Sequence, residues 1–300
     1  MITRRGFMRG LVGTLGLGAI TSAYAMAFEP LYRLNTTHYA FTPPRWRPGH
    51  TLRIVALADF HFCRPWMNEA RAAEIVARAN ALKPDIILLL GDFMAGMAVF
   101  KSADIAPAIW AGILASLEAP LGIHAILGNH DWWEDEGAMR RQEGPTLAST
   151  ALEKAGIRVY ENDALRLEKN GHAFWLAGLG DQLAFINEWR AGKAKTRGRD
   201  DLAGMFAKIT TDEPVILMAH EPDIFPRVPD RVSLTLSGHT HGGQVRLFGI
   251  SPIVPSRYGQ RYAYGHVVEE NRHLGARLPI RIGIPPEVVV IDLGGEAPGA

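Results

Sequence analysis

The sequence predicts an α/β fold, a four-layer αββα sandwich in one domain, and three observations carry this prediction. Short runs of Val, Ile and Leu recur in both halves of the chain. Stretches with helical spacing lie between the early runs, and five of the runs end in polar motifs. Strands that alternate with helices indicate α/β layers, and strands in both halves indicate two packed sheets with helices outside.

The five apolar runs are continuous rather than alternating, which is typical of strands buried on both faces. They cover residues 52–58, 86–90, 123–127, 215–219 and 232–236. In open α/β sheets the ligand crevice lies outside the carboxyl ends of the strands. We therefore expect all five polar motifs to lie there.

The segments between these runs predict two helices and a hairpin. Residues 68–82 and 102–117 carry apolar residues at helical spacing. Residues 158–168 and 172–179 predict a hairpin around Asn170-Gly171, which is a strong turn signal.

Two further stretches complete the chain. Residues 279–293 are strand-like. The basic stretch 187–201 is expected to be a solvated surface loop rather than a binding patch.

Composition limits the functional classes. The chain of 300 residues is 47% apolar and 21% charged, as is ordinary for a globular protein with a sizeable core. The net charge of +1 implies no general attraction to nucleic acid. The single cysteine, Cys63, excludes an intramolecular disulfide and a Cys-based zinc site. It follows His61 by two residues, and we expect it to be a small packing residue rather than part of the site mouth.

The N-terminus, residues 1–27, predicts a targeting segment. Arg4 and Arg5 precede Phe7 and an uncharged, weakly apolar stretch, and this start resembles a twin-arginine export signal. The expected partner is then the twin-arginine export machinery, and the expected location is the periplasm or the outer face of the cytoplasmic membrane. A retained N-terminal anchor is the alternative, since the roughly 18 uncharged residues could just span a bilayer. Residues 28–50 are expected to be a lead-in, and residues 51–300 the domain.

The polar motifs contain metal-ligand residue types. Neighbouring strand residues i and i+2 point the same way, so Asp59 and His61 can converge on one ion. His239 and His241 can do likewise if their loop is extended. Carboxylate oxygen and imidazole nitrogen together suit Mn, Fe or Zn better than Ca or Mg. One Asp-x-His is a weak signal, whereas five motifs at strand ends form a strong one.

The motifs together carry a resemblance to a family. The order Asp-x-His, Gly-Asp, Gly-Asn-His-Asp, a lone His after a strand, and Gly-His-Thr-His resembles the calcineurin-like metallophosphoesterase superfamily. The bacterial exported phosphodiesterases related to calcineurin-like UDP-2,3-diacylglucosamine pyrophosphatases are the branch it resembles most. The resemblance implies the calcineurin-like phosphoesterase fold. One departure is His273, which stands where relatives usually carry a Gly and would strain a turn that needs positive φ.

The resemblance also implies a dinuclear site, with Mn²⁺ expected and Fe or Zn as alternatives. Its ligands would be Asp59, His61 and His241 on the first metal, Asn129, His220 and His239 on the second, and Asp92 between both. Two such ions can generate hydroxide at neutral pH and clamp phosphate oxygens. His130 would bind no metal and, as the catalytic residue, would face the substrate phosphate. It would donate a proton to the leaving oxygen or stabilise charge on it.

The predicted function is therefore that of a dinuclear metal-dependent phosphoesterase acting on a phosphodiester or pyrophosphate. A lipid-linked substrate such as UDP-2,3-diacylglucosamine competes with a soluble one. The alternatives are a phosphomonoesterase on a soluble substrate and a catalytically silent metal-binding domain. The intact ligand set and His130 argue against the silent domain.

Neighbouring polar residues leave roles open. Asp131 is expected to be structural, and His124 to belong to the core. Glu221 and Asp223 are either partners of the metal ligands or parts of a turn.

Three tryptophans, Trp66, Trp132 and Trp133, lie close in sequence to two of the motifs. They form either an apolar rim for an acyl chain or base, or ordinary core packing. The sequence does not decide between the two.

Overall fold

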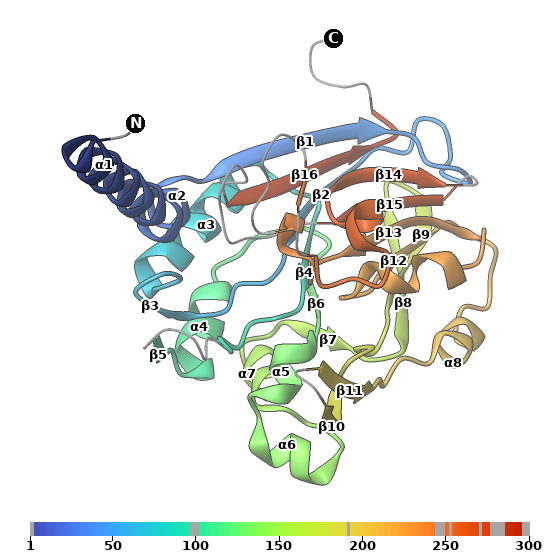
Figure 1. Ribbon diagram of the computed structural model, residues 1–300. Helices are drawn as coiled ribbons and strands as arrows, with labels where there is room; N and C mark the ends of the chain where they lie inside the picture. Colours follow the sequence, from blue (N-terminus) through green and yellow to red (C-terminus); the bar gives the residue numbers. More distant parts are fainter. Residues whose placement is uncertain are drawn as a thin grey trace.

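Two six-stranded sheets face each other, and helices cover their outer faces (Figure 1). The computed structural model describes residues 3–96, 102–190, 193–243, 250–251, 254–269, 272–276 and 286–295. In the view of Figure 1, α3 and α4 lie on the left, α8 lies on the right, and the strands lie between them. The predicted four-layer αββα sandwich is confirmed.

The first sheet contains the three early apolar runs. Its strands, in spatial order, are β1 (Asn35–Phe41), β16 (Glu287–Leu293), β2 (Leu52–Leu57), β4 (Ile86–Leu90), β6 (Ile123–Ile126) and β7 (Arg158–Tyr160). The strands β2, β4, β6 and β7 are parallel, so their carboxyl ends lie at one edge.

The second sheet contains the two later runs. Its strands are β14 (Gly265–Glu269), β15 (Arg272–Ala276), β13 (Val232–Ser237), β12 (Val215–Met218), β9 (His172–Gly178) and β8 (Asp163–Lys169). Here β15, β13, β12 and β9 are parallel. His273 lies in β15 opposite Val268 rather than in a turn.

The predicted hairpin is present as β8 and β9. Asn170 and Gly171, at its tip, have φ of 53° and 78°, as a two-residue hairpin turn with positive φ requires. Its first strand begins later than predicted, at Asp163. Residues 158–160 instead form β7 and pair with β6 in the other sheet.

The two predicted helices are present as α3 and α4, and further short helices that were not predicted follow. Together, these helices are α3 (Glu69–Ala81), α4 (Pro107–Leu114), α5 (Asn129–Trp133), α6 (Glu136–Arg141), α7 (Leu147–Lys154) and α8 (Leu202–Ala207), with short 3₁₀ turns η2 (Pro222–Arg227), η3 (His241–Gly243) and η4 (Gly259–Tyr262). The second predicted helix is shorter than residues 102–117 because it begins at Pro107, a residue favoured in the first helical turn. Residues 103–104 form β5, which pairs with β3 (Cys63–Arg64).

Alternation along each strand divides the core into layers. Ile54 and Ala56 of β2 pack between the two sheets, in one cluster with Leu236 of β13. Val55 and Leu57 point the other way and pack with the helices of the first sheet. Both faces are buried, which explains why the strand sequences are continuously apolar.

The lead-in is part of the domain, which corrects the expected boundary at residue 51. Residues 35–41 form β1, which pairs with β16 at the edge of the first sheet. Trp46 and His50 are buried, and the Trp46 indole nitrogen donates to the His50 carbonyl at 2.6 Å.

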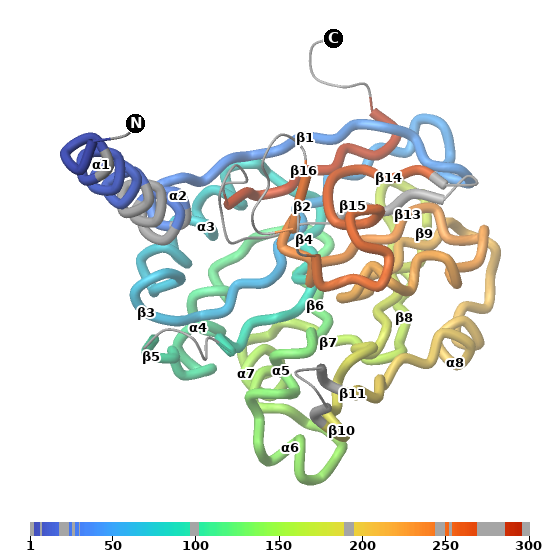
Figure 2. The backbone as a smooth tube through the Cα atoms, viewed as in Figure 1, coloured from blue at the N-terminus to red at the C-terminus, as the bar shows by residue number. Residues whose placement is uncertain are grey.

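The N-terminal segment projects from one edge of the molecule (Figure 2). It consists of α1 (Arg4–Ala23), a π-helical turn η1 (Tyr24–Phe28) and α2 (Glu29–Tyr32). Among the described residues, no helix has the length and apolar character needed to cross a membrane.

The basic stretch is a hairpin rather than the predicted loop. β10 (Phe185–Arg190) and β11 (Lys193–Arg197) pair in antiparallel fashion. Two of its cations lie over aromatic rings: the Arg197 guanidinium is 5.0 Å from the Phe185 ring centre, and that of Arg199 is 5.1 Å from Trp132. These contacts order a segment that its charge alone would leave in solvent.

Candidate metal centre

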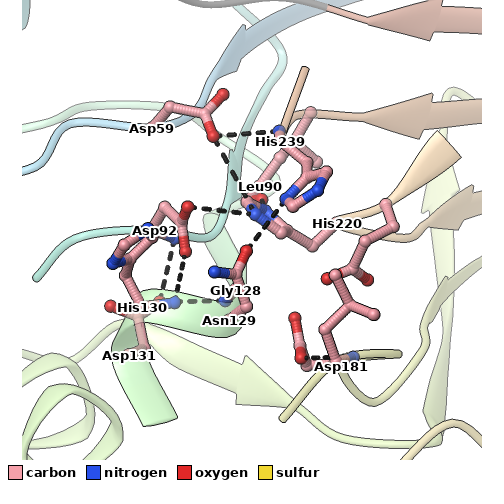
Figure 3. A network of polar contacts seen from close by, with 12 residues as sticks. Asp59, Leu90, Asp92, Gly128, Asn129, His130, Asp131, Asp181, His220 and His239 are labelled. Carbon is pink, nitrogen blue, oxygen red and sulfur yellow. Dashed lines mark hydrogen bonds and ion pairs between the residues drawn. The ribbon is translucent and has the colours of Figure 1, made fainter. Parts of the chain in front are cut away.

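The five polar motifs meet outside the carboxyl ends of the strands, as predicted. Asp59 follows β2, Asp92 follows β4, and Asn129 follows β6 in the first sheet. His220 follows β12 and His239 follows β13 in the second sheet. Figure 3 shows these side chains pointing toward one another.

The candidate ligands are oriented by backbone in the left-handed region rather than by alternation along a strand. Asp59 and His61 lie beyond the end of β2 and have φ of 52° and 45°. Asp92, His239 and His241 also have positive φ, at 59°, 66° and 50°. The loop at the last two is therefore not extended, so the condition under which they would converge by strand alternation is not met. Non-glycine residues in this region cost on the order of 1–3 kcal/mol each and gather at functional sites.

The first cluster contains four side chains whose ligand atoms lie within 4.8 Å of one another. They are Asp59, His61, Asp92 and His241. The Nε2 atoms of His61 and His241 are 3.2 Å apart. The Nε2 atom of His61 is also 3.5 Å from Asp92 Oδ2, and that of His241 is 3.6 Å from Asp59 Oδ1.

The second cluster shares Asp92 with the first. It contains Asp92, His220 and His239. Nε2 of His220 lies 3.2 Å from Asp92 Oδ2. Nδ1 of His239 lies 2.9 Å from Asn129 Oδ1, which brings the amide to the same place. The structure thus brings together all seven predicted ligands, with Asp92 between two groups.

The chemistry of these donors fits cations. His61 donates from Nδ1 to the Met94 carbonyl at 2.9 Å, and burial lowers its pKa to about 4. Its Nε2 therefore carries a lone pair that points into the cluster. His220 likewise donates from Nδ1 to the Leu90 carbonyl at 2.6 Å. Oδ2 of Asp59 is buried without a hydrogen-bond partner.

The surroundings of His220 also favour a cation. Burial lowers its pKa, but Asp92 and Glu221 outweigh burial and raise the pKa of His220 well above its usual value. The 3.2 Å between its Nε2 and Asp92 Oδ2 marks a point where a cation fits. Seven donors around two such points suit two divalent ions of the Mn, Fe or Zn type.

Asp131 holds together the loop after β4 and the loop after β6. Its Oδ1 accepts from the backbone N–H groups of Phe93 and Met94 at 2.8 and 3.0 Å. Its Oδ2 accepts from those of Asp92 and Gly128, both at 2.9 Å. Burial and the nearby charge of Asp92 raise the pKa of Asp131 to about 6. The prediction of a structural role is confirmed.

Gly128 is required by close approach. A Cβ atom at this position would lie 2.4 Å from Asp92 Oδ1 and 2.6 Å from the His220 ring. Any side chain there would push the two residues out of place.

His130 lies beside the first cluster but belongs to neither group of ligands. Its backbone N–H donates to Asp92 Oδ1 at 2.8 Å, and its ring contacts those of His61 and Trp133. Burial lowers its pKa, but the carboxylates of Asp92 and Glu134 raise the pKa of His130 above its usual value.

Residues 52–243 match the Calcineurin-like phosphoesterase family, and this span holds all the polar motifs. The chain belongs to that family. As a calcineurin-like phosphoesterase it is a metal-dependent phosphoric ester hydrolase.

Several curated proteins are similar along most of the phosphoesterase chain. "Uncharacterized metallophosphoesterase YkuE" of Bacillus subtilis is 29% identical, covering 97% of this chain and 98% of its own. "Phosphodiesterase YaeI" of Escherichia coli is 28% identical, covering 98% and 100%. "UDP-2,3-diacylglucosamine pyrophosphatase LpxG" of Chlamydia trachomatis is 26% identical, covering 82% and 80%.

Two acidic residues, Glu221 and Asp181, lie beside the second cluster of the phosphoesterase. The sequence indicates Glu221 as a candidate but not Asp181. Asp181 is buried, and burial together with the charge of Glu221 raises its pKa well above the usual value. The backbone N–H of Gln182 donates to Glu221 Oε2 at 3.0 Å. The side-chain amide of Gln182 donates to the Glu221 carbonyl oxygen at 2.7 Å. Asp181 follows β9, so the signal that could have found it is a sixth apolar run that ends in Gly-Asp.

Asp223 and the predicted core residues lie away from the clusters. Asp223 accepts from Ser256 Oγ at 2.5 Å and from the Arg257 N–H at 3.0 Å, so it braces a turn. His124 is buried and bonded through Nδ1 to the Tyr160 hydroxyl at 2.9 Å. Cys63 is buried, as expected of a packing residue.

The tryptophans do not form one apolar rim in this phosphoesterase. Trp132 is buried in the core and meets Phe185 edge to face at 5.3 Å. Trp133 is half-buried beside His130, and its indole nitrogen donates to the Leu183 carbonyl at 2.9 Å. Trp66 is also half-buried. A rim that includes Trp132 is therefore wrong, because adjacent helical residues point in different directions.

Proposed function

We propose that the enzyme holds two divalent ions and hydrolyses a phosphodiester or pyrophosphate bond. The observation that carries this proposal is the position of Asp92, whose carboxylate is shared by both clusters. The proposed ligands are Asp59, His61, Asp92, Asn129, His220, His239 and His241. Mn²⁺ is the proposed metal, with Fe or Zn as alternatives, because the donor set mixes carboxylate oxygen with imidazole nitrogen.

When bound, the two ions would supply a hydroxide nucleophile at neutral pH and neutralise charge on the phosphate. The residues of the chain do the rest. His130 donates a proton to the leaving oxygen as the bond between that oxygen and phosphorus breaks. It regains a proton from solvent, and the new phosphorus–oxygen bond carries the oxygen of water into the product. Asp131 and Gly128 keep Asp92 and His130 in place during the reaction.

The substrate class is proposed from the relatives. One relative is named a phosphodiesterase, and another is named a UDP-2,3-diacylglucosamine pyrophosphatase. These names favour a diester or pyrophosphate over a monoester, and they support a lipid-linked substrate over a soluble one. A panel of bis(p-nitrophenyl) phosphate, p-nitrophenyl phosphate and UDP-2,3-diacylglucosamine separates the three classes, with the lowest rate expected on the monoester.

The test of the metal proposal is removal and replacement. Chelator-treated enzyme should lose hydrolysis of bis(p-nitrophenyl) phosphate and recover it best with Mn²⁺. Asp92→Asn should leave less than about a tenth of the wild-type rate, a loss of at least ~1.4 kcal/mol of barrier stabilisation. Asp212→Asn is the matched control, because that side chain is 89% exposed. Activity above a tenth in Asp92→Asn would contradict a bridging carboxylate.

A further inference from the structure

Glu134 lies four residues after His130, and its Oε1 contacts the Nδ1 atom of the His130 ring. We propose that Glu134 is the positioning residue of His130: its carboxylate accepts a hydrogen bond from Nδ1–H and leaves Nε2 to serve the leaving oxygen. This inference rests on the proposed function, in which His130 is the proton donor. Glu134 itself touches neither metal cluster.

The helix brings the two side chains together. His130 lies in α5, and Glu134 caps the C-terminal end of that helix, with its N–H donating to the His130 carbonyl at 3.1 Å. Residues four apart share one helix face. The His130 Nδ1 atom is accordingly 3.2 Å from Glu134 Oε1. The pair lies at the mouth of the site, where the two side chains are 25% and 39% exposed.

The backbone closes over this contact at Gly96. A Cβ atom on Gly96 would lie 2.0 Å from His130 Nδ1 and 2.9 Å from Glu134 Oε1, and the φ of Gly96 is +59°. Only glycine fits there. The chain therefore leaves room for this pair beside a loop that also carries Asp92.

Aromatic rings limit the other directions in which His130 could turn. The Trp133 ring centre is 5.3 Å from that of His130, and the indole is held by the Leu183 carbonyl. The ring of His61 meets His130 edge on at 4.9 Å. These neighbours and Glu134 surround the His130 ring in the orientation in which Nδ1 is bonded.

The chemical consequence concerns the proton. A carboxylate on one ring nitrogen fixes the tautomer and stabilises the charged imidazolium, which can then donate from the other nitrogen. A poor leaving group needs this proton, whereas an acidic one departs without it. Loss of Glu134 should therefore matter most for poor leaving groups.

The first test needs no activity. Long-range ¹H–¹⁵N spectra of the metal-free protein at pH 8 report which nitrogen of His130 carries the proton, with His130→Ala providing the assignment. We expect the Nδ1–H form in the wild type and in the control Glu136→Ala, whose side chain is 87% exposed. Glu134→Ala should shift His130 toward the Nε2–H form. Identical tautomers in wild type and Glu134→Ala would overturn the proposal.

The second test compares two aryl methyl phosphodiesters, one with a phenol and one with a p-nitrophenol leaving group. Glu134→Ala should lower kcat for the phenyl ester on the order of 10-fold to 100-fold. The p-nitrophenyl ester should lose less than about threefold, and metal content and KM should stay unchanged. Glu134→Gln keeps an acceptor and should recover part of the loss. In a His130→Ala background, Glu134→Ala should add no further loss.

The kinetic outcomes separate the two proposals. Equal losses on both esters, or additive losses with His130→Ala, would overturn the role of Glu134 while leaving the phosphodiesterase intact. A wild-type enzyme that hydrolyses neither ester with Mn²⁺ would overturn the proposed function. The tautomer measurement would then still decide whether Glu134 orients His130.

Discussion

At the scale of single residues, the side chains that meet at the site are aimed by backbone with positive φ at Asp59, His61 and Asp92. The ligand set could be found because each member follows an apolar run. The positive φ values of Asp59, His61 and Asp92 could not, because strand periodicity has no information about the residues just beyond a strand. The Asp131 carboxylate shows what holds that geometry: it binds four N–H groups of two loops.

Asp131→Asn tests this role. The amide replaces one acceptor oxygen by a donor that faces buried N–H groups, so we expect the free energy of unfolding to fall by about 2–4 kcal/mol. Urea unfolding of the metal-free protein measures the change, and metal content should fall with it. The exposed Asp212→Asn variant should be unchanged in both respects. A stable variant with full metal content would show that other contacts position Asp92.

At the scale of elements, continuous apolar runs predicted the five central strands to within a residue or two at their ends. Two of the failures come from contact with remote partners. The lead-in contains β1 because residues 35–41 pair with residues 287–293, at the other end of the chain. Just after the hairpin β10–β11, Arg199 lies over the ring of Trp132, which is remote in sequence. The local sequence pattern of the lead-in or of the hairpin does not show these remote partners.

The lead-in also contains a histidine, His50, whose contribution to the free energy of unfolding depends on pH. His50 is buried between Trp46 and His172, with ring centres at 4.6 and 5.0 Å. Burial, and the charges of His172 and Lys169, lower the pKa of His50 to about 4. The unfolded chain, with a pKa near 6.5, binds this proton more readily, so the contribution is present above about pH 6.5 and is lost as pH falls toward 4.

His50→Phe should remove this dependence while keeping the ring stack. Between pH 8 and pH 5, the free energy of unfolding of the wild type should fall by about 2 kcal/mol more than that of the variant. Urea titrations in the presence of chelator measure the difference without a contribution from metal release. Parallel pH profiles for the two proteins would show that His50 titrates normally in the folded chain.

At the scale of the whole molecule, the site exists only when both sheets are packed. Asp59, Asp92 and Asn129 come from the first sheet, whereas His220 and His239 come from the second. Ions that bind both sets stabilise the folded state over the unfolded chain. An export route that carries folded proteins would allow the metals to be acquired in the cytoplasm, and the N-terminal arginines resemble the signal of such a route.

Export should therefore depend on the paired arginines in α1. Changing Arg4 and Arg5 together to Lys keeps the charge but removes the pair that a receptor reads, so full-length protein should accumulate in the cytoplasm. Arg9→Lys, a change of the same kind outside the pair, is the control and should be exported normally. Fractionation followed by N-terminal sequencing gives the measurement. Export that survives the double change would indicate a general secretory signal, and residues 1–25 in the mature protein would indicate a retained anchor. Because the body of the protein is untouched, the cytoplasmic double variant should still hydrolyse bis(p-nitrophenyl) phosphate with Mn²⁺, which separates failed export from failed folding.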